Sequence, residues 1–265
     1  MLAPRWMIIL TISYVLTCSS RAQMNESIET MSTEVNGHQL SYLLQVPDAQ
    51  APAEGWPLIL FLHGYGECGT DINLVKVHGP PKRWPEMGAL QQCVIVSPQC
   101  PANSWWRVAA LKALVDELID ERSDIDPNRL YITGLSMGGY GTWSFLSHYP
   151  DYFAAALPIC GGGNPLELGD NPSIDETGIV NEFLPDGLLR AKATPIWTFH
   201  GTDDQTVRIE ETSRLVDRLK QASAPNVKFT SLKDVNHVRA WQMTYTDPKV
   251  WEWLFEQKKQ QKRPR

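Results

Sequence analysis

Short apolar runs recur along the chain, and each is followed by a turn or by a stretch in which apolar residues recur at helical spacing. Runs of this length, bounded by turn residues, are typical of buried β-strands. We predict strands at Leu58–Leu62, Leu130–Ile132, Thr194–Phe199 and Val227–Leu232, and two more that end in SPQCP (97–101) and PICGGG (158–163).

The stretches between these strands predict amphipathic helices. Apolar residues at 111, 114, 115, 118 and 119 would line one face of a helix, and Leu215 and Leu219 would do the same in a second. Strands that alternate with helices favour a largely parallel sheet covered on both faces. The predicted fold class is therefore α/β.

The segment RLYITGLSMGGYG (129–141) predicts a strand that breaks into a sharp turn carrying Ser136. Glycines at 134 and 138 leave room for a strained turn, and Gly139 allows the following helix, predicted to end near Pro150, to pack closely. A turn of this kind is a nucleophile elbow, in which the serine hydroxyl stands clear of the backbone. Asp126-Pro127-Asn128, just before it, indicates a turn.

A serine hydroxyl needs a base and a group that orients the base, because it is a poor nucleophile at neutral pH. In this architecture the chain order is serine, acid, histidine. Asp203 and Asp204 follow the predicted strand at 194–199, and His237 follows the next strand. Two adjacent side chains point in different directions, so one of the two aspartates is expected to meet the histidine, and the residues alone leave the choice open.

His237 is the one histidine that lies beyond the candidate acid. His200 is expected to brace its own turn, because it precedes the acid at the end of a strand. His38 and His148 are expected to be surface or packing residues, and the other two histidines that precede the acid are His63 and His78.

Two backbone N–H groups are candidates for holding the oxyanion that forms when a serine attacks a carbonyl. The apolar run 58–62 ends in His63-Gly64-Tyr65-Gly66-Glu67. A glycine-flanked loop there can direct the Tyr65 N–H toward the same point as the N–H of Met137, the residue after the nucleophile. The alternative is an ordinary strand-to-helix turn.

These residues resemble the serine esterases of the α/β-hydrolase superfamily, in particular the dienelactone-hydrolase-like and phospholipase/carboxylesterase group that includes predicted peptidases related to prolyl oligopeptidase. The resemblance spans nearly the whole chain after residue 22; it rests on LHGYGECGTD (62–71), VHGPPK (77–82), SPQCP, GLSMGGYGTW (134–143), PICGGG, FHGTDD (199–204) and DVNH with the tryptophan four residues later (234–241).

The resemblance implies an α/β-hydrolase fold, with Asp204 as the acid and His237 as the base. The chain departs from the family pattern at Val235 and Asn236, where glycine-type residues are common. It also carries extra residues at about 164–190, where insertions often cover the active site.

The predicted function is an exported serine hydrolase that cleaves carboxylic esters through an acyl-enzyme, on acylated carbohydrates or phenolic esters. The alternatives are a prolyl-oligopeptidase-like serine peptidase and a catalytically dead binding protein. Trp105, Trp106 and Trp241 are candidate contacts for the substrate. The fold alone does not define the substrate.

Residues 1–22 predict a signal peptide, because Arg5 precedes an apolar run and Ser20 and Ala22 suit a cleavage site. The run is too short to span a bilayer. Cys18 is a weak candidate for a lipid anchor. We therefore expect export to the periplasm or the exterior, no stable membrane insertion, and a single α/β-hydrolase domain over residues 23–265.

Export would permit disulfides among the remaining cysteines, whose pairing the sequence leaves open. Cys68, Cys100 and Cys160 follow predicted strand ends on the same side, and some pair of them is a candidate bridge; the remaining cysteine is Cys93.

The net charge of −6 argues against a nucleic-acid partner. The chain contains none of the common signatures for zinc, phosphate-loop or dinucleotide binding, so the sequence implies neither a metal nor an organic cofactor.

Overall fold

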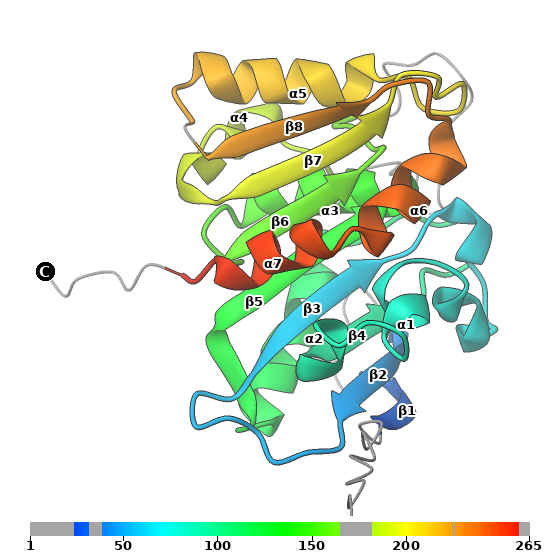
Figure 1. Cartoon of the computed structure of the whole chain (residues 1–265), viewed down its shortest axis with the longest axis vertical. Coiled ribbons are helices and arrows are strands. Elements are labelled where there is room, and N and C mark those ends of the chain that lie inside the picture. The colour runs from blue at the N-terminus through cyan, green and yellow to red at the C-terminus, as the bar shows by residue number, and fades with distance from the viewer. Residues whose placement is uncertain (1–23, 32–38, 165–181, 225, 260–265) are drawn as a thin grey trace, which may run out of the picture.

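The computed structural model describes residues 24–31, 39–164, 182–224 and 226–259 (Figure 1). The predicted signal peptide and the greater part of the predicted insertion, residues 165–181, lie outside the described residues. No helix in the described ranges has the length and apolar character needed to cross a membrane.

An eight-stranded sheet forms the centre of the structure, with the spatial order β1-β2-β4-β3-β5-β6-β7-β8 (Figure 1). β2 pairs antiparallel with both β1 and β4. The neighbouring strands in the rest of the sheet pair in parallel, in the order β4, β3, β5, β6, β7 and β8. The strands are β1 Met24–Thr30, β2 Ser41–Pro47, β3 Trp56–Leu62, β4 Val94–Pro98, β5 Ile125–Leu135, β6 Ala155–Ile159, β7 Ile196–Gly201 and β8 Val227–Leu232.

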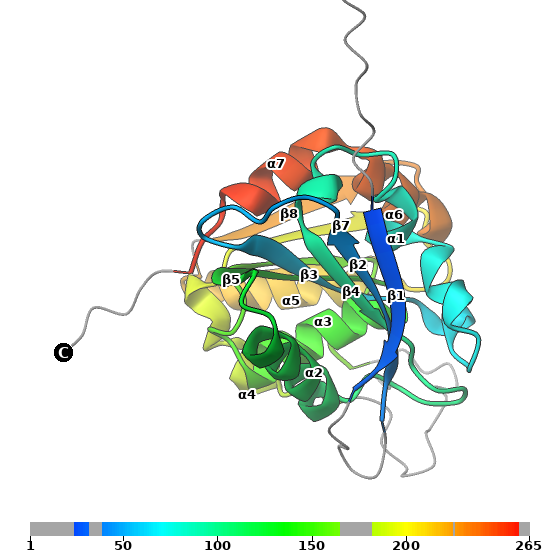
Figure 2. The same cartoon turned by 90° about the horizontal axis from the view of Figure 1, so that it is seen from below.

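Helices cover both faces of the sheet (Figure 2). The α-helices are α1 Gly79–Arg83, α2 Val108–Glu121, α3 Met137–His148, α4 Pro185–Leu188, α5 Glu210–Gln221, α6 His237–Thr246 and α7 Pro248–Glu256. Short 3₁₀ helices lie at η1 Tyr65–Glu67, η2 Ile72–Lys76, η3 Leu90–Gln92 and η5 Ala191–Ala193. α2, α3, α4 and α5 lie on one face, and α1, α6 and α7 lie on the other.

β3 shows why the sheet needs helices on both sides. All of its side chains are buried, and successive side chains point to opposite faces. Leu58, Leu60 and Leu62 join the apolar core under α2, α3 and α5. Ile59 and Phe61 join the second core, under α6 and α7. The predicted architecture, a mostly parallel sheet with helices on both faces, is confirmed.

β5 differs from its prediction at one end. The turn expected at residues 126–128 is instead part of the strand, where the pairing with β3 shifts between Trp56 and Leu58. The Asp126 carboxylate accepts hydrogen bonds from the Asn128 N–H, at 2.8 Å, and from Arg129 Nε, at 2.7 Å. The turn-forming residues therefore make local side-chain hydrogen bonds at an irregularity within the strand and do not form a separate turn.

Candidate active site

Ser136 lies between β5 and α3 in a backbone conformation that few residues adopt, with φ 54° and ψ −117°. The turn is tight. A Cβ atom at position 134 would lie 2.2 Å from the carbonyl oxygen of Gly138, and one at position 138 would lie 2.0 Å from that of Leu62. Glycine is therefore required at both positions. The close packing of the turn holds Ser136 in its strained conformation at the carboxyl ends of the parallel strands.

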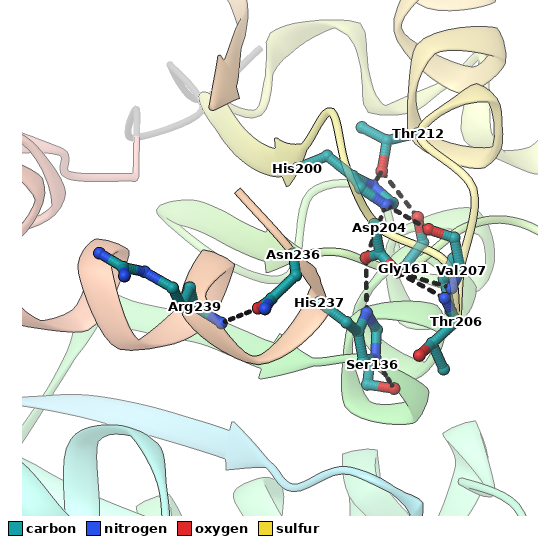
Figure 3. Close-up of polar contacts among 10 residues, drawn as sticks. All are labelled: Ser136, Gly161, His200, Asp204, Thr206, Val207, Thr212, Asn236, His237 and Arg239. Carbon is teal, nitrogen blue, oxygen red and sulfur yellow. Dashed lines mark hydrogen bonds and ion pairs between the residues drawn. The ribbon is translucent and has the colours of Figure 1, made fainter. Parts of the chain in front are cut away.

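The structure brings Ser136, His237 and Asp204 together (Figure 3). His237 Nε2 lies 2.9 Å from Ser136 Oγ, and His237 Nδ1 lies 2.5 Å from Asp204 Oδ2. The three residues come from the ends of β5, β7 and β8 and are far apart in sequence. An ionised carboxylate only accepts hydrogen bonds, so Nδ1 carries the proton and Nε2 presents its lone pair to the serine hydroxyl.

Asp204, and not Asp203, holds the histidine. Asp203 is exposed, whereas Asp204 is buried. The second carboxylate oxygen of Asp204, Oδ1, accepts the backbone N–H groups of Thr206, at 2.9 Å, and Val207, at 2.8 Å. Burial alone would raise the pKa of the Asp204 carboxyl, but hydrogen bonds from His200 and His237 hold that pKa well below its usual value. The carboxylate therefore stays ionised at neutral pH.

His200 is a further contact of Asp204 that sequence reasoning missed (Figure 3). Its ring is fully buried and bonds to Thr212 Oγ1 and to the Val207 carbonyl, each at 2.8 Å, so it braces its turn as expected. Because the carbonyl can only accept, Nε2 carries a proton, and the same atom lies 3.2 Å from Asp204 Oδ2. The spacing of four residues between His200 and Asp204 was the signal available in the sequence.

His237 begins a helix rather than lying in a loop. It is the first residue of α6, and the side chain of Asn236 caps that helix by accepting the N–H of Arg239 at 3.0 Å. The asparagine that departs from the family pattern therefore has a structural use, since asparagine is among the best N-cap residues. On the next turn of α6, Trp241 meets the His237 ring edge to face at 5.1 Å between centroids.

The two candidate oxyanion donors both lie at helix starts. Tyr65 is the first residue of η1, and Met137 is the first residue of α3. The first N–H groups of a helix have no partner within that helix, so they are available to a ligand. A Cβ at position 64 would lie 2.9 Å from the Leu135 side chain, which places the loop beside the residue that precedes Ser136.

Glu67 and His63 hold this loop by hydrogen bonds to the two main-chain groups of Gly64. Glu67 Oε2 accepts the N–H of Gly64 at 2.9 Å. His63 Nε2 accepts the N–H of Cys100 at 3.0 Å, so its Nδ1 is the protonated nitrogen and donates to the Gly64 carbonyl at 2.6 Å. Burial lowers the pKa of His63 to about 4, so the ring is neutral. Sequence reasoning assigned neither residue a part in the site.

The three tryptophans suggested as substrate contacts occupy different environments. Trp106 is buried, and its Nε1 donates to the His63 carbonyl at 3.4 Å, so it supports the loop from the core side. Trp241 is also buried, between the rings of His237 and His78. Trp105 is half-buried and lies edge to face with Tyr140 at 6.0 Å. Of the three, Trp105 is the one whose surface is most open to a substrate.

One group of potential metal ligands exists among the described residues, formed by Cys160, Asp204 and His237, with ligand atoms within 4.8 Å of one another. Asp204 Oδ2 and His237 Nδ1 are already joined by a hydrogen bond. A metal ion at this point would have to displace that bond. The arrangement is therefore better suited to moving a proton between histidine and serine than to holding a cation.

Residues 106–261 match the prolyl oligopeptidase family. This range includes Ser136, Asp204 and His237 and covers more than half of the chain. The chain belongs to the prolyl oligopeptidase family. This match confirms the α/β-hydrolase fold predicted from the sequence. It also confirms the predicted resemblance of the chain to the serine esterases of that superfamily.

The proteins to which the chain is similar include ones named as a carboxylesterase, a depolymerase and an esterase. The chain is 32% identical over 202 residues to a probable carboxylesterase SOBER1-like from Arabidopsis thaliana, covering 68% of this chain and 71% of the relative. It is 28% identical over 201 residues to poly(3-hydroxyalkanoate) depolymerase C from Paucimonas lemoignei, covering 65% of this chain and 46% of the relative. Among solved structures, a thermostable esterase superposes with a TM-score of 0.73 and 34% identity, over 88% of this chain and 63% of that one.

The chain is shorter than several of these proteins. It spans about half the length of the depolymerase and of the putative esterase NocK from Nocardia uniformis subsp. tsuyamanensis, at 46% and 50%. What those larger proteins do as a whole therefore does not transfer directly to this chain.

Proposed function

We propose that this member of the prolyl oligopeptidase family is a serine hydrolase that cleaves carboxylic esters through an acyl-enzyme. The observation that carries the proposal is the continuous hydrogen-bonded series from Ser136 Oγ through His237 to Asp204. A nucleophile, a base and a group that orients the base are the minimum set for acyl transfer by serine.

In the proposed first step, His237 Nε2 takes the Ser136 proton as the hydroxyl oxygen attacks the ester carbonyl. Asp204 stabilises the imidazolium that forms, without itself taking the proton. The N–H groups of Tyr65 and Met137 donate to the oxygen on which negative charge develops. His237 then gives its proton to the departing alcohol, and the acyl group remains on Ser136.

In the second step, water attacks the acyl-enzyme with His237 again as the base. The second tetrahedral intermediate uses the same N–H donors and collapses to release the carboxylic acid and Ser136. Each turnover consumes one ester and one water, and the enzyme returns to its starting protonation state.

For the substrate we propose acylated carbohydrates or phenolic esters, with Trp105 as the aromatic contact. The half-buried Trp105 ring meets Tyr140, one helical turn after Ser136, and Tyr65, which is 44% exposed, follows Gly64, which lies against Leu135. Flat apolar surfaces of this kind stack on sugars and on phenolic rings. The esterase names among the relatives agree with an ester substrate.

We also propose that the protein acts outside the cytoplasm. This rests on the composition of residues 1–22, in which a basic residue precedes an apolar run and small residues follow. The N-terminus of the secreted protein, read by Edman degradation or mass spectrometry, would test cleavage after Ala22.

The test of the proposed reaction compares wild type with Ser136→Ala on short acyl esters, acetylated xylan, feruloyl sugars and dipeptide amides. We expect ester turnover to fall by about 10⁴-fold or more in Ser136→Ala, because the triad acts as a unit. A fluorophosphonate probe should label wild type and leave the variant unlabelled. Ser213→Ala on α5, which lies outside the site, is the matched control.

Three outcomes would contradict the proposal. Ester turnover in Ser136→Ala close to that of wild type would exclude Ser136 as the nucleophile. Faster cleavage of amides than of esters would favour a peptidase. Failure of the probe to label folded wild-type protein would indicate a binding protein without activity.

A further inference from the structure

The loop that carries Tyr65 is joined to the end of β4 by three hydrogen bonds. The N–H of Cys100 donates to His63 Nε2 at 3.0 Å, and the N–H of Gly69 donates to the Cys100 carbonyl at 2.9 Å. Gln99 Nε2 donates to the Glu67 carbonyl at 2.9 Å. Residues 67–69 and residues 99–100 are therefore held side by side, although about 30 residues separate them in the chain.

Cys68 lies in the middle of this junction and faces Cys100. The residue after Cys68, Gly69, donates its N–H to the Cys100 carbonyl at 2.9 Å, and this brings the two thiols close enough to interact. Cys68 Sγ also lies 4.0 Å from Met137 Sδ. Cys68 packs against the apolar core to which Cys100 belongs. Cys93 and Cys160 belong to the core on the other face of the sheet, so neither competes as a partner. All four are free thiols in the structure.

We propose that Cys68 and Cys100 form a modification site, at which a small disulfide oxidant such as glutathione disulfide converts the two thiols into one cystine. The site stands beside the proposed active site and does not depend on the function proposed for it. Two thiols in contact, on backbone segments already held together, need little movement to reach disulfide geometry.

The thiol–disulfide exchange with glutathione disulfide takes place in two steps. The Cys68 thiol loses its proton, and its sulfur attacks glutathione disulfide; one glutathione leaves as a thiol and the other stays bound to Cys68. The Cys100 thiol then loses its proton and attacks the Cys68 sulfur, which releases the second glutathione. The two protein thiols are oxidised by two electrons, and the glutathione disulfide is reduced to two thiols.

The order of the two steps follows from exposure. Cys68 is half-buried and reaches solvent, whereas Cys100 is 1% exposed. The hydrogen bond that the Cys100 thiol donates to Cys68 and the burial of the group raise the pKa of the Cys100 thiol. Burial also raises the pKa values of Cys93 and Cys160. Cys68 is thus the thiol that meets the oxidant, and Cys100 is the one that resolves the mixed disulfide.

The cystine would make the existing junction covalent. A bridge between residues 68 and 100 closes a loop of about 30 residues and reduces the freedom of the unfolded chain. The oxidised protein should therefore unfold at a temperature higher by about 5 °C than the reduced protein.

The first test uses the full chain with its native cysteines, equilibrated with glutathione disulfide and digested with trypsin without reduction. Cys68 and Cys100 fall on different tryptic peptides, and the peptide of residues 84–107 carries both Cys93 and Cys100. The digestion is therefore repeated on Cys93→Ser. We expect a crosslinked peptide that joins Cys68 to Cys100 and an intact mass lower by about 2 Da, for the two hydrogens lost.

The second test compares melting temperatures before and after oxidation. Wild type and Cys93→Ser should both melt at a higher temperature after oxidation. Cys68→Ser and Cys100→Ser should show no rise, and Cys68→Ser should also fail to accumulate a glutathione adduct. Because the crosslink is read on wild type, the proposal stays testable if a variant fails to fold.

Three results would overturn the proposal. One is a stable glutathione adduct on Cys68 with the Cys100 thiol still free. Another is a crosslink from Cys68 to Cys93 or Cys160 in place of Cys100. The third is that both Cys68 and Cys100 remain free thiols in folded protein at equilibrium with excess glutathione disulfide.

Discussion

The candidate active site has two halves that are built differently. The side-chain half comprises Ser136, His237 and Asp204, with His200 behind them, and its contacts join one side chain to another. The backbone half is the loop of residues 63–69, whose contacts are mostly between side chains and main-chain groups. Both halves stand at the carboxyl ends of parallel strands, which is where ligands bind in open α/β sheets.

Two buried histidines, His63 and His200, show how the two halves of the site differ. His63 and His200 are equally buried, at 1% and 0% exposed. Among the described residues, the hydrogen-bond partners of the His63 ring are main-chain groups, and burial lowers the pKa of His63 to about 4. His200 lies 3.2 Å from a buried carboxylate, which it shares with His237. The same residue type is thus a neutral brace held by main-chain groups in one half and a partner of a buried carboxylate in the other, according to its neighbours.

The largest expected effect comes from breaking the side-chain half. Asp204→Asn should lower kcat for an ester by about 10⁴-fold, because an amide does not stabilise the imidazolium and favours the wrong histidine tautomer. Steady-state kinetics on a short acyl ester would measure it.

Asp203→Asn is the matched control: the Asp203 carboxylate is exposed, so this substitution is expected to leave kcat unchanged. Equal losses in the two variants would mean that the hydrogen bond to His237 is not what matters.

The next effect concerns stability and tests the neutral state of His63. Its pKa is lower in the folded state, at about 4, than the ordinary value of 6.5. Between these values the unfolded chain binds more protons, so stability falls as the pH drops through that window. Wild type should lose about 2 kcal/mol more than His63→Gln between pH 7 and pH 5.

Urea unfolding at several pH values would measure this difference. Glutamine can still accept from the Cys100 N–H and donate to the Gly64 carbonyl, so the variant should fold. Parallel pH dependences in the two proteins would show that His63 titrates normally.

The smallest expected effect is on the backbone half. Glu67→Ala removes the acceptor of the Gly64 N–H and should lower kcat by about 10-fold with little change in KM, because the Tyr65 donor is then less well placed for the oxyanion. Glu67→Gln keeps an acceptor oxygen and should recover most of the activity.

Glu86→Ala is the control, since this exposed carboxylate pairs only with Arg83 in the contacts of the described residues. The affinity for a trifluoromethyl ketone, which mimics the tetrahedral intermediate, should fall in Glu67→Ala in parallel with kcat. A change confined to KM would instead assign Glu67 to substrate binding.

The backbone half was the harder one to predict, for a physical reason. The elbow is signalled locally by the glycines around Ser136: a Cβ at position 134 would clash with Gly138 four residues later, although Gly138 itself is required by its close approach to Leu62 at the end of β3. The environment of His63 depends on Cys100, which reaches it only through the pairing of β3 with β4. No pattern near residue 63 reports that contact.

The sequence by itself determined the alternation of strands and helices, the fold class, and the places in the chain where a serine, an acid and a histidine follow strand ends. These depend on local burial patterns, turn chemistry and chain order. The resemblance in the sequence already pointed to Asp204 as the acid, and His200 lies only four residues before it. Only the tertiary structure decided that His237 meets both Ser136 and Asp204, that Trp106 lies in the core against His63, and that Cys68 meets Cys100. Each of these is a contact between segments distant in the chain, and such contacts exist only once the sheet has set the order of its strands.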